Sequence, residues 1–183
     1  SLTCIATVVM GKDDDSKYLA GAVPEENGMV VFSNSFSVEG KSSTAIHDAL
    51  LAWAQQMVET SISAPGNYAR IMGDENNNIE ARVCEWLVMK KKTLNLDRAR
   101  MRYQMSIQIA GTNVTIKISQ IVYHYGEDME GNNGVTYKAE EWISDREALN
   151  KTQTKLYPKS GKFRRKTCDR MAELFASAQT ACQ

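Results

Sequence analysis

The residues best suited to chemistry lie near position 124, where a histidine is followed by carboxylates. His124 stands between two tyrosines, and Glu127 and Asp128 follow in an acidic, glycine-rich stretch from 126 to 134 that also holds Glu130. A histidine within hydrogen-bond reach of a carboxylate can act as a general acid or base if both line a pocket. One hypothesis is therefore a hydrolase-type enzyme with its site near His124 and the 126–134 loop. The other interpretation is that His124 is a surface or capping residue at a strand end.

A second candidate is a basic stripe of three arginines at alternate positions. Arg98, Arg100 and Arg102 share one face of a predicted strand, and Lys90–Lys92 are near in sequence. Such a stripe suits an anionic ligand or a protein partner. A nucleic-acid surface would need exposed aromatic rings between the basic residues, whereas Tyr103 is predicted on the opposite face. Because 22 basic residues also balance 22 acidic ones, we expect no nucleic-acid partner.

Recognised motifs for catalysis or metal binding are missing from the sequence. It contains no G-x-S-x-G, H-E-x-x-H, P-loop or dinucleotide fingerprint. Asp128-x-Glu130-x-Asn132 begins like a calcium loop, but Asn133 stands where the turn glycine should be. We therefore predict no catalytic motif, no cofactor and no metal. The surface candidates that remain are Arg98, Arg100, Arg102, His124, Glu127 and Asp128.

The four cysteines are Cys4, Cys84, Cys168 and Cys182, widely separated and without C-x-x-C spacing. A zinc site is therefore not expected. The favoured interpretation is free thiols buried as small apolar residues, and the alternative is a disulfide between Cys4 and one of the others.

These candidates must be positioned by strands, which alternating apolar residues predict. The clearest alternation runs from Ala99 to Ile109. The alternation slips at Gln120, where a β-bulge or the end of the ladder is predicted. It slips again near Glu85, where either the buried side changes or both faces are covered, and a bulge is predicted to account for it. The predicted strands are 29–38, 68–72, 79–89, 99–109 and 114–125, with a further short β segment over 5–10.

Two main helices are predicted to pack on this sheet. The first follows the hydroxyl-rich run Ser42–Thr44 and carries Ile46, Leu50, Trp53 and Met57 at helical spacing. Helical character is also expected over 138–149. The last helix is predicted over 162–180 and opens with Lys162, Arg164, Arg165 and Lys166. Positive charge is unfavourable there against the helix dipole, so either these residues contact acidic groups, for example in the 126–134 loop, or the cluster arises by chance.

The predicted elements follow the order strand, helix, four antiparallel strands and late helix. A resemblance to a known family rests on this order and on Val30-Val31-Phe32, Trp53 and Ile121-Val122-Tyr123 within it. From about Met29 to Tyr125 the chain resembles a family of uncharacterised exported bacterial proteins, a domain of unknown function with a TATA-binding-protein-like fold. The resemblance implies an α+β fold with a curved antiparallel sheet of about five strands. Two main helices would cover one face, with an N-terminal β segment and a C-terminal helical extension added. The family supplies no catalytic residues to carry over.

The composition, with 43% hydrophobic and 24% charged residues in 183, is that of a globular protein. We expect a single domain over 1–183, with a family-like core at about 29–125 and a helical extension at 126–183. No stretch approaches the roughly 20 apolar residues of a membrane-spanning helix.

The resemblance implies export from a Gram-negative bacterial cytoplasm to the periplasm, the outer membrane or the exterior. The chain starts at Ser1 without methionine, which fits either a processed or a truncated chain, and no signal peptide is present in the sequence. The favoured function is a non-catalytic binding or interaction domain of an exported envelope protein, whose partner is a protein or an anionic ligand at the cell envelope. The hydrolase near His124 is the alternative.

Overall fold

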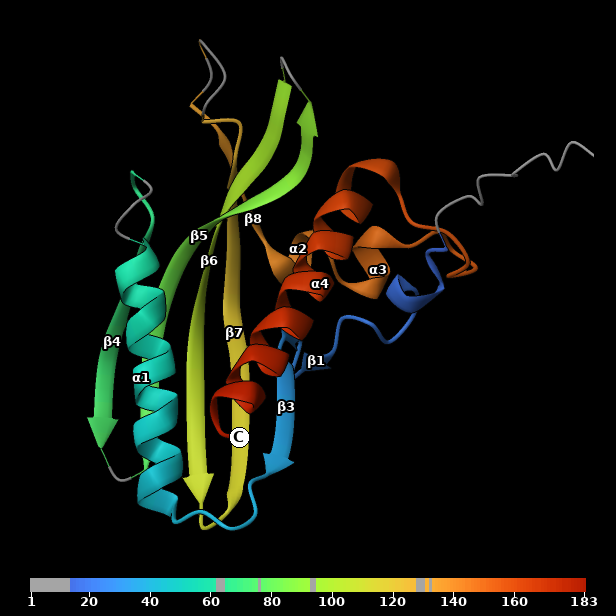
Figure 1. Cartoon of the computed structure of the whole chain (residues 1–183). Helices are drawn as coiled ribbons and strands as arrows, with labels where there is room; N and C mark the ends of the chain where they lie inside the picture. The colour runs from blue at the N-terminus through green and yellow to red at the C-terminus, as the bar shows by residue number, and fades with distance from the viewer. Residues whose placement is uncertain (1–13, 62–64, 76, 93–94, 128–130, 132) are drawn as a thin grey trace, which may run out of the picture.

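The main element of the fold is a six-stranded antiparallel sheet in the order β3-β7-β6-β5-β4, with β8 paired to β7. The computed structural model describes residues 14–61, 65–75, 77–92, 95–127, 131 and 133–183. Two long helices, α1 (Ser43–Ser61) and α4 (Pro158–Ala181), cover one face of the sheet (Figure 1). The predicted α+β class is confirmed. The strands are β3 (Phe32–Ser37), β4 (Tyr68–Glu75), β5 (Asn78–Lys92), β6 (Asn95–Ala110), β7 (Asn113–Tyr125) and β8 (Val135–Lys138).

The sheet is larger than the predicted five strands because β7 runs past the end of β3. β3 pairs with residues 113–118 of β7, and β8 pairs with residues 122–125 on the same outer edge. Among the described residues, positions 119–121 have no register partner in either short strand. The four residues of β8 are too few to give a periodic signal in the sequence. The outer edge of β7 is thus covered in two pieces with a gap between them.

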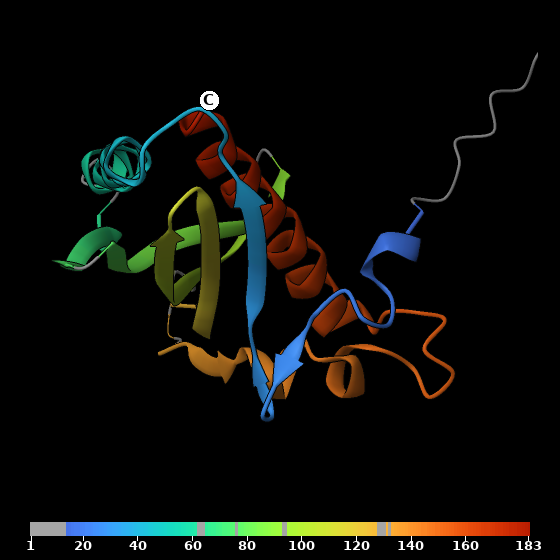
Figure 2. The same cartoon turned by 90° about the horizontal axis from the view of Figure 1, so that it is seen from below.

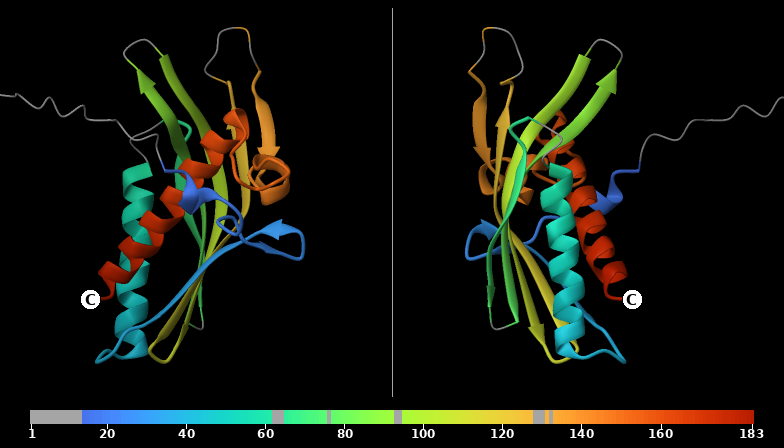
Figure 3. Two further views of the ribbon diagram at one scale, coloured as in Figure 1. Left: turned by 90° about the vertical axis from the view of Figure 1, so that its right-hand side faces the viewer. Right: turned by 60° about the vertical axis from the view of Figure 1, so that its left-hand side comes forward.

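The strand predicted over 29–38 is divided in two. Its first residues form β2 (Met29–Val30), which pairs with β1 (Glu25–Glu26) in a separate small hairpin. Asn27 and Gly28 make the turn, with φ angles of 52° and 77° that suit these two residues. The hairpin stands out on the side of the sheet opposite the helices, as both views in Figure 3 show.

The bulge predicted at Gln120 is confirmed. Gln120 has a φ of 54°, and the β6–β7 register shifts between Arg102 and Gln104, opposite this residue. Ile118 and Ile121 are three residues apart and would point to opposite sides of a regular strand. The extra residue of the bulge turns both side chains toward the helices, and both are fully buried. A local irregularity therefore keeps the apolar face of β7 continuous along its whole length.

The bulge predicted near Glu85 is wrong. The register of β5 shifts instead opposite Ile71 to Gly73 of β4 and after its own Val88. Between these places both faces of β5 are covered, because Val83 and Cys84 point to opposite sides and each is only 3% exposed. The slip in the apolar pattern thus marks burial on two sides rather than a distortion of the strand.

The core lies between the helices and the sheet. Ser42 caps α1 through its hydroxyl, which accepts a hydrogen bond of 3.1 Å from the Ala45 amide, as its sequence predicts. The Trp53 indole of α1 donates to the Ser177 hydroxyl of α4 over 2.9 Å. α4 begins at Pro158, earlier than predicted, since proline is well tolerated in a first turn. Figure 2 shows α4 running across the sheet beside α1. Buried residues that fill this layer include Ile46, Leu50, Met101, Met105, Ile107, Ile116, Ile118, Tyr123, Met171 and Leu174.

Shorter elements pack around the first half of α4. The helical character expected over 138–149 appears as two four-residue helices, α2 (Ala139–Trp142) and α3 (Asp145–Ala148). A 3-10 turn, η1 (Ser16–Tyr18), precedes the β1–β2 hairpin. The β segment predicted over 5–10 lies outside the described residues. None of the described helices is long and apolar enough to cross a membrane.

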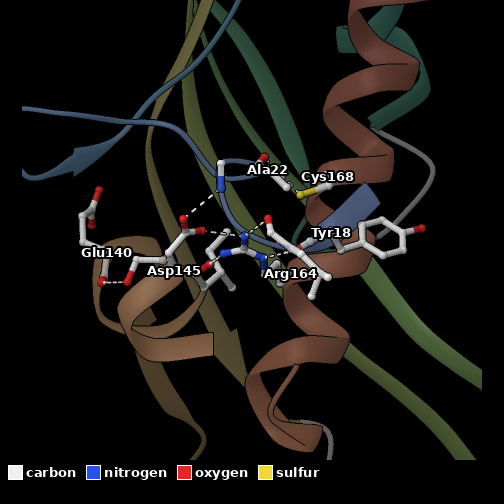
Figure 4. A network of polar contacts seen from close by, with 10 residues as sticks. Tyr18, Ala22, Glu140, Asp145, Arg164 and Cys168 are labelled. Carbon is white, nitrogen blue, oxygen red and sulfur yellow. Dashed lines mark hydrogen bonds and ion pairs between the residues drawn. The ribbon is translucent and has the colours of Figure 1, made fainter. Parts of the chain in front are cut away.

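Arg164 of α4 holds these shorter elements together. Its side chain is fully buried, and its guanidinium donates to the backbone oxygens of Tyr18 (2.6 Å), Leu19 (2.7 Å) and Ile143 (2.7 Å). The same group forms an ion pair of 2.6 Å with the Asp145 carboxylate (Figure 4). The interpretation that the basic residues opening the last helix contact acidic groups is therefore confirmed for Arg164, and also for Lys162 and Arg165, which pair with Asp97 and Asp15. These three carboxylates lie outside the 126–134 loop.

The cysteines agree in part with the expectation of buried free thiols. Cys84 and Cys182 are buried and free, whereas Cys168 is free and partly exposed. Burial raises the pKa of the Cys168 thiol to about 11, against the opposing effect of the Arg164 charge. Cys4 lies outside the described residues.

Candidate anion-binding face of the sheet

The sheet face opposite α1 and α4, called the open face, carries polar side chains. Residues paired across antiparallel strands point to the same side, and Arg82 pairs with Gln104 while Cys84 pairs with Arg102. Alternation along β5 and β6 therefore places both arginines on the open face, two residues apart on neighbouring strands. Their side chains are exposed.

Arg82 and Arg102 border a hollow of about 170 Å³, called the arginine hollow. Neither guanidinium makes a hydrogen bond or ion pair with any other residue that the structure describes. No carboxylate lines the hollow. The nearby Glu80 is already occupied, since it accepts hydrogen bonds from Ser106 (2.6 Å) and Gln104 (3.3 Å). The lining residues are Tyr68, Arg82, Val83, Arg102, Tyr103, Gln104, Gln120 and Val122.

The three arginines of the predicted stripe have different surroundings. Arg100 donates to Glu127, to the Asn67 side chain (2.8 Å) and to the Pro65 backbone oxygen (3.0 Å). The guanidiniums of Arg98 and Arg100 also lie 3.7 and 4.1 Å from the centre of the Trp86 ring. These contacts are cation–π interactions that hold side chains in place. Of the stripe, only Arg102 borders the arginine hollow.

A glycine permits the contacts of Arg100. Gly66 has a φ of 77°, and a Cβ at this position would lie 2.6 Å from the Arg100 guanidinium. The backbone therefore approaches the arginine as closely as only glycine allows. This approach brings the segment before β4 across the open face.

His124 and Glu127 are close together, as the sequence suggested. His124 Nε2 lies 3.5 Å from the Glu127 carboxylate, and its Nδ1 lies 3.1 Å from the Thr136 hydroxyl of β8. Glu127 is also bound by Arg100, which neutralises its charge. Asp128 lies outside the described residues, as does Glu130. Neither His124 nor Glu127 lines the arginine hollow, so these two residues would not face a substrate bound in that hollow.

Sequence reasoning missed Arg82, Tyr68 and the two glutamines of the hollow. Arg82 shares a strand face with Cys84 and Trp86, so the same alternation that placed the stripe could have found it. Gln120 reaches the hollow through its bulge, which the sequence did indicate. Trp86 was also overlooked as the aromatic partner of the stripe, although it pairs in register with Arg100.

Comparison with known families identifies the group to which these strands belong. The family described as "Domain of unknown function (DUF4468) with TBP-like fold" matches residues 32–124. The chain belongs to this family. The match extends from β3 through α1 and β4 to β7, so the DUF4468 region contains every residue that lines the arginine hollow. The predicted family and its TBP-like fold are confirmed.

Solved structures of similar proteins share the fold well beyond the DUF4468 match. A DUF4468 family protein from Bacteroides ovatus ATCC 8483 is 34% identical, with a TM-score of 0.83, over 93% of this chain and 96% of that chain. A TBP-like protein from Parabacteroides distasonis ATCC 8503 is 25% identical, with a TM-score of 0.72, over 88% and 97%. A comparison with curated proteins finds no match.

Proposed function

We propose that this DUF4468 protein is a non-catalytic binding module that holds an anionic ligand against its open face. The observation that carries the proposal is the pair Arg82 and Arg102, two exposed guanidiniums beside one hollow with no carboxylate in its lining. Arginine binds carboxylate and phosphate groups through a planar fork of donors. Two neighbouring positive charges also repel each other, and a bound anion relieves that repulsion.

The other groups of the hollow suit a small ligand. Gln104 and Gln120 supply amide donors and acceptors, and Tyr68 supplies an aromatic wall. Nucleic acid is not part of the proposal, because the half-buried Trp86 ring already lies against two guanidiniums and the Tyr68 ring lies against that of Arg70.

Export from the cytoplasm belongs to the same proposal and is supported by the family resemblance. Fractionation of the native organism with an antibody to the protein tests it. Recovery of the protein with the cytoplasmic markers would refute export while leaving the anion site untouched.

The binding proposal is tested by nuclear magnetic resonance of arginine side chains. Acetate and inorganic phosphate are titrated at constant ionic strength, and the Nε signals of Arg82 and Arg102 are followed. Saturable shifts are expected for these two residues. Arg146, whose side chain is 72% exposed on α3, serves as the control and should not shift.

A substitution sharpens the test. Arg102→Gln should weaken anion binding by about tenfold or more, because hydrogen bonds to charged groups contribute about 1.5–3 kcal/mol. Arg146→Gln removes the same charge elsewhere and should leave binding unchanged. Equal, non-saturating shifts at Arg82, Arg102 and Arg146 would show general ionic screening and would refute the proposal.

A further inference from the structure

A second hollow, called the edge hollow, adjoins the arginine hollow. It has a volume of about 430 Å³ and lies beside β7 where the outer edge is covered by neither β3 nor β8. The tip of the β1–β2 hairpin forms one wall, and the start of α2 forms another. The lining residues are Gly28, Met29, Gln120, Ile121, Val122, Lys138, Glu140 and Glu141.

Apolar side chains form part of the edge hollow. Met29 is 45% exposed at the hairpin tip, although it is a large apolar residue. Val122 is half-buried beside it in the lining. Methionine adapts its shape to apolar ligands, and an exposed apolar wall within a hollow is typical of a binding surface.

The two hollows share the lining residues Gln120 and Val122 and are therefore adjacent on the sheet. Arg102, Val122 and Lys138 are register partners across β6, β7 and β8. With neighbouring strands about 4.8 Å apart, the two outer positions lie about 10 Å from each other. Gln120 sits between the hollows in a left-handed backbone conformation, which costs free energy for a residue other than glycine.

The charges of the edge hollow divide between its walls. Glu140 is occupied, since its carboxylate accepts a hydrogen bond of 2.8 Å from the Val30 amide. Lys138 and Glu141 are both exposed and carry opposite charges. Arg82 and Arg102 therefore have no carboxylate in their hollow, whereas Lys138 shares the edge hollow with Glu140 and Glu141, and the exposed apolar side chain of Met29 also lies in the edge hollow.

We infer that the two hollows form one site for a small amphiphilic anion. Its carboxylate or phosphate head lies on Arg82 and Arg102, and its short apolar chain crosses Val122 toward Met29. The inference rests on the proposed anion site and adds the chemical class of the ligand. The arginine hollow of about 170 Å³ is smaller than the roughly 300–1,000 Å³ of small-molecule sites, but together with the edge hollow of about 430 Å³ it falls within that range.

The experiment titrates the full chain with acetate, butanoate, hexanoate and octanoate, and follows binding by calorimetry and by the Arg102 Nε signal. Affinity should rise by up to about fourfold for each methylene that leaves water, until the chain outgrows the edge hollow. Octyl phosphate distinguishes a phosphate head from a carboxylate head. Octylammonium has the same chain with the opposite charge and should bind at least tenfold more weakly.

Two variants separate the parts of the site. Met29→Ser should lower the affinity for octanoate by fivefold or more and leave acetate binding unchanged. Met72→Ser, which replaces an even more exposed methionine on β4, is the matched control and should change neither. Arg102→Gln should weaken every member of the series by a similar factor.

The outcomes distinguish the inference from the proposal beneath it. If acetate binding depends on Arg102 but the affinity does not rise with chain length from acetate to octanoate, the inference of an amphiphilic ligand is refuted. The proposed anion site is then retained. Octylammonium that binds as tightly as octanoate would show adsorption to an apolar surface and would also overturn the inference of an amphiphilic ligand. Binding of no anion through Arg102 would overturn both.

Discussion

Replacing Arg164 with methionine should destabilise the protein severely. The guanidinium is fully buried, donates to three backbone oxygens and pairs with Asp145. Methionine fills a similar volume but leaves these three oxygens and the carboxylate without their donor. Loss of one partner from a buried, hydrogen-bonded ion pair costs about 3–5 kcal/mol. We expect the free energy of unfolding to fall by this amount, a large share of the roughly 5–15 kcal/mol that holds a domain folded.

The measurement is urea unfolding followed by circular dichroism and tryptophan fluorescence. Arg146→Met is the control, because this arginine is 72% exposed and its pair with Glu147 should contribute less than about 1 kcal/mol. Combining Arg164→Met with Asp145→Leu should cost less than the two separate losses together, because the residues interact directly. A loss at Arg164 no larger than at Arg146 would refute the reasoning.

Two further predictions concern α1. Trp53→Phe removes the indole donor to Ser177 and should lower the free energy of unfolding by about 1–2 kcal/mol in urea; an unchanged midpoint would contradict a hydrogen bond between the helices. Burial lowers the pKa of His47, but hydrogen bonds to Asp74 and Asp48 outweigh it and raise the pKa above 6.5. The stabilisation by His47 should therefore be complete below pH 6.5 and be lost as the pH rises through the folded pKa. His47→Gln should accordingly cost more stability at about pH 5.5 than at about pH 8.5, and equal costs would show that no such linkage exists.

Features set by neighbouring residues were predictable from the sequence. The alternation of β6 depends only on the period of two in a strand, and the start of α1 depends on the hydroxyl of Ser42. The bulge at Gln120 was visible because it interrupts an otherwise regular apolar pattern. The family and the arrangement of helices on one face were predicted from the resemblance, which rests on the order of the elements and on residues such as Trp53.

Features set by distant residues were not predictable in the same way. The stripe of arginines looked uniform in the sequence, yet Arg100 is engaged by Asn67 and Glu127 from two other segments. Arg164 looked like one member of a basic cluster in the sequence. It is buried in the structure because its four hydrogen-bonding partners, which come from η1, α2 and α3 and the residues that follow them, surround its guanidinium. β8 forms because β7 offers an uncovered edge, and no property of its own four residues requires it.

The position of α4 after the strands in the sequence has a consequence for folding. β5, β6 and β7 follow one another and pair with their neighbours in sequence, so they can form from local contacts. Their apolar face is completed by a helix that is synthesised after all the strands of the sheet, through contacts such as Trp53 with Ser177, 124 residues apart, and Arg164 with Tyr18, 146 apart. A nascent chain therefore carries an uncovered apolar sheet until α4 emerges. We expect chaperone binding during synthesis to concentrate on that face.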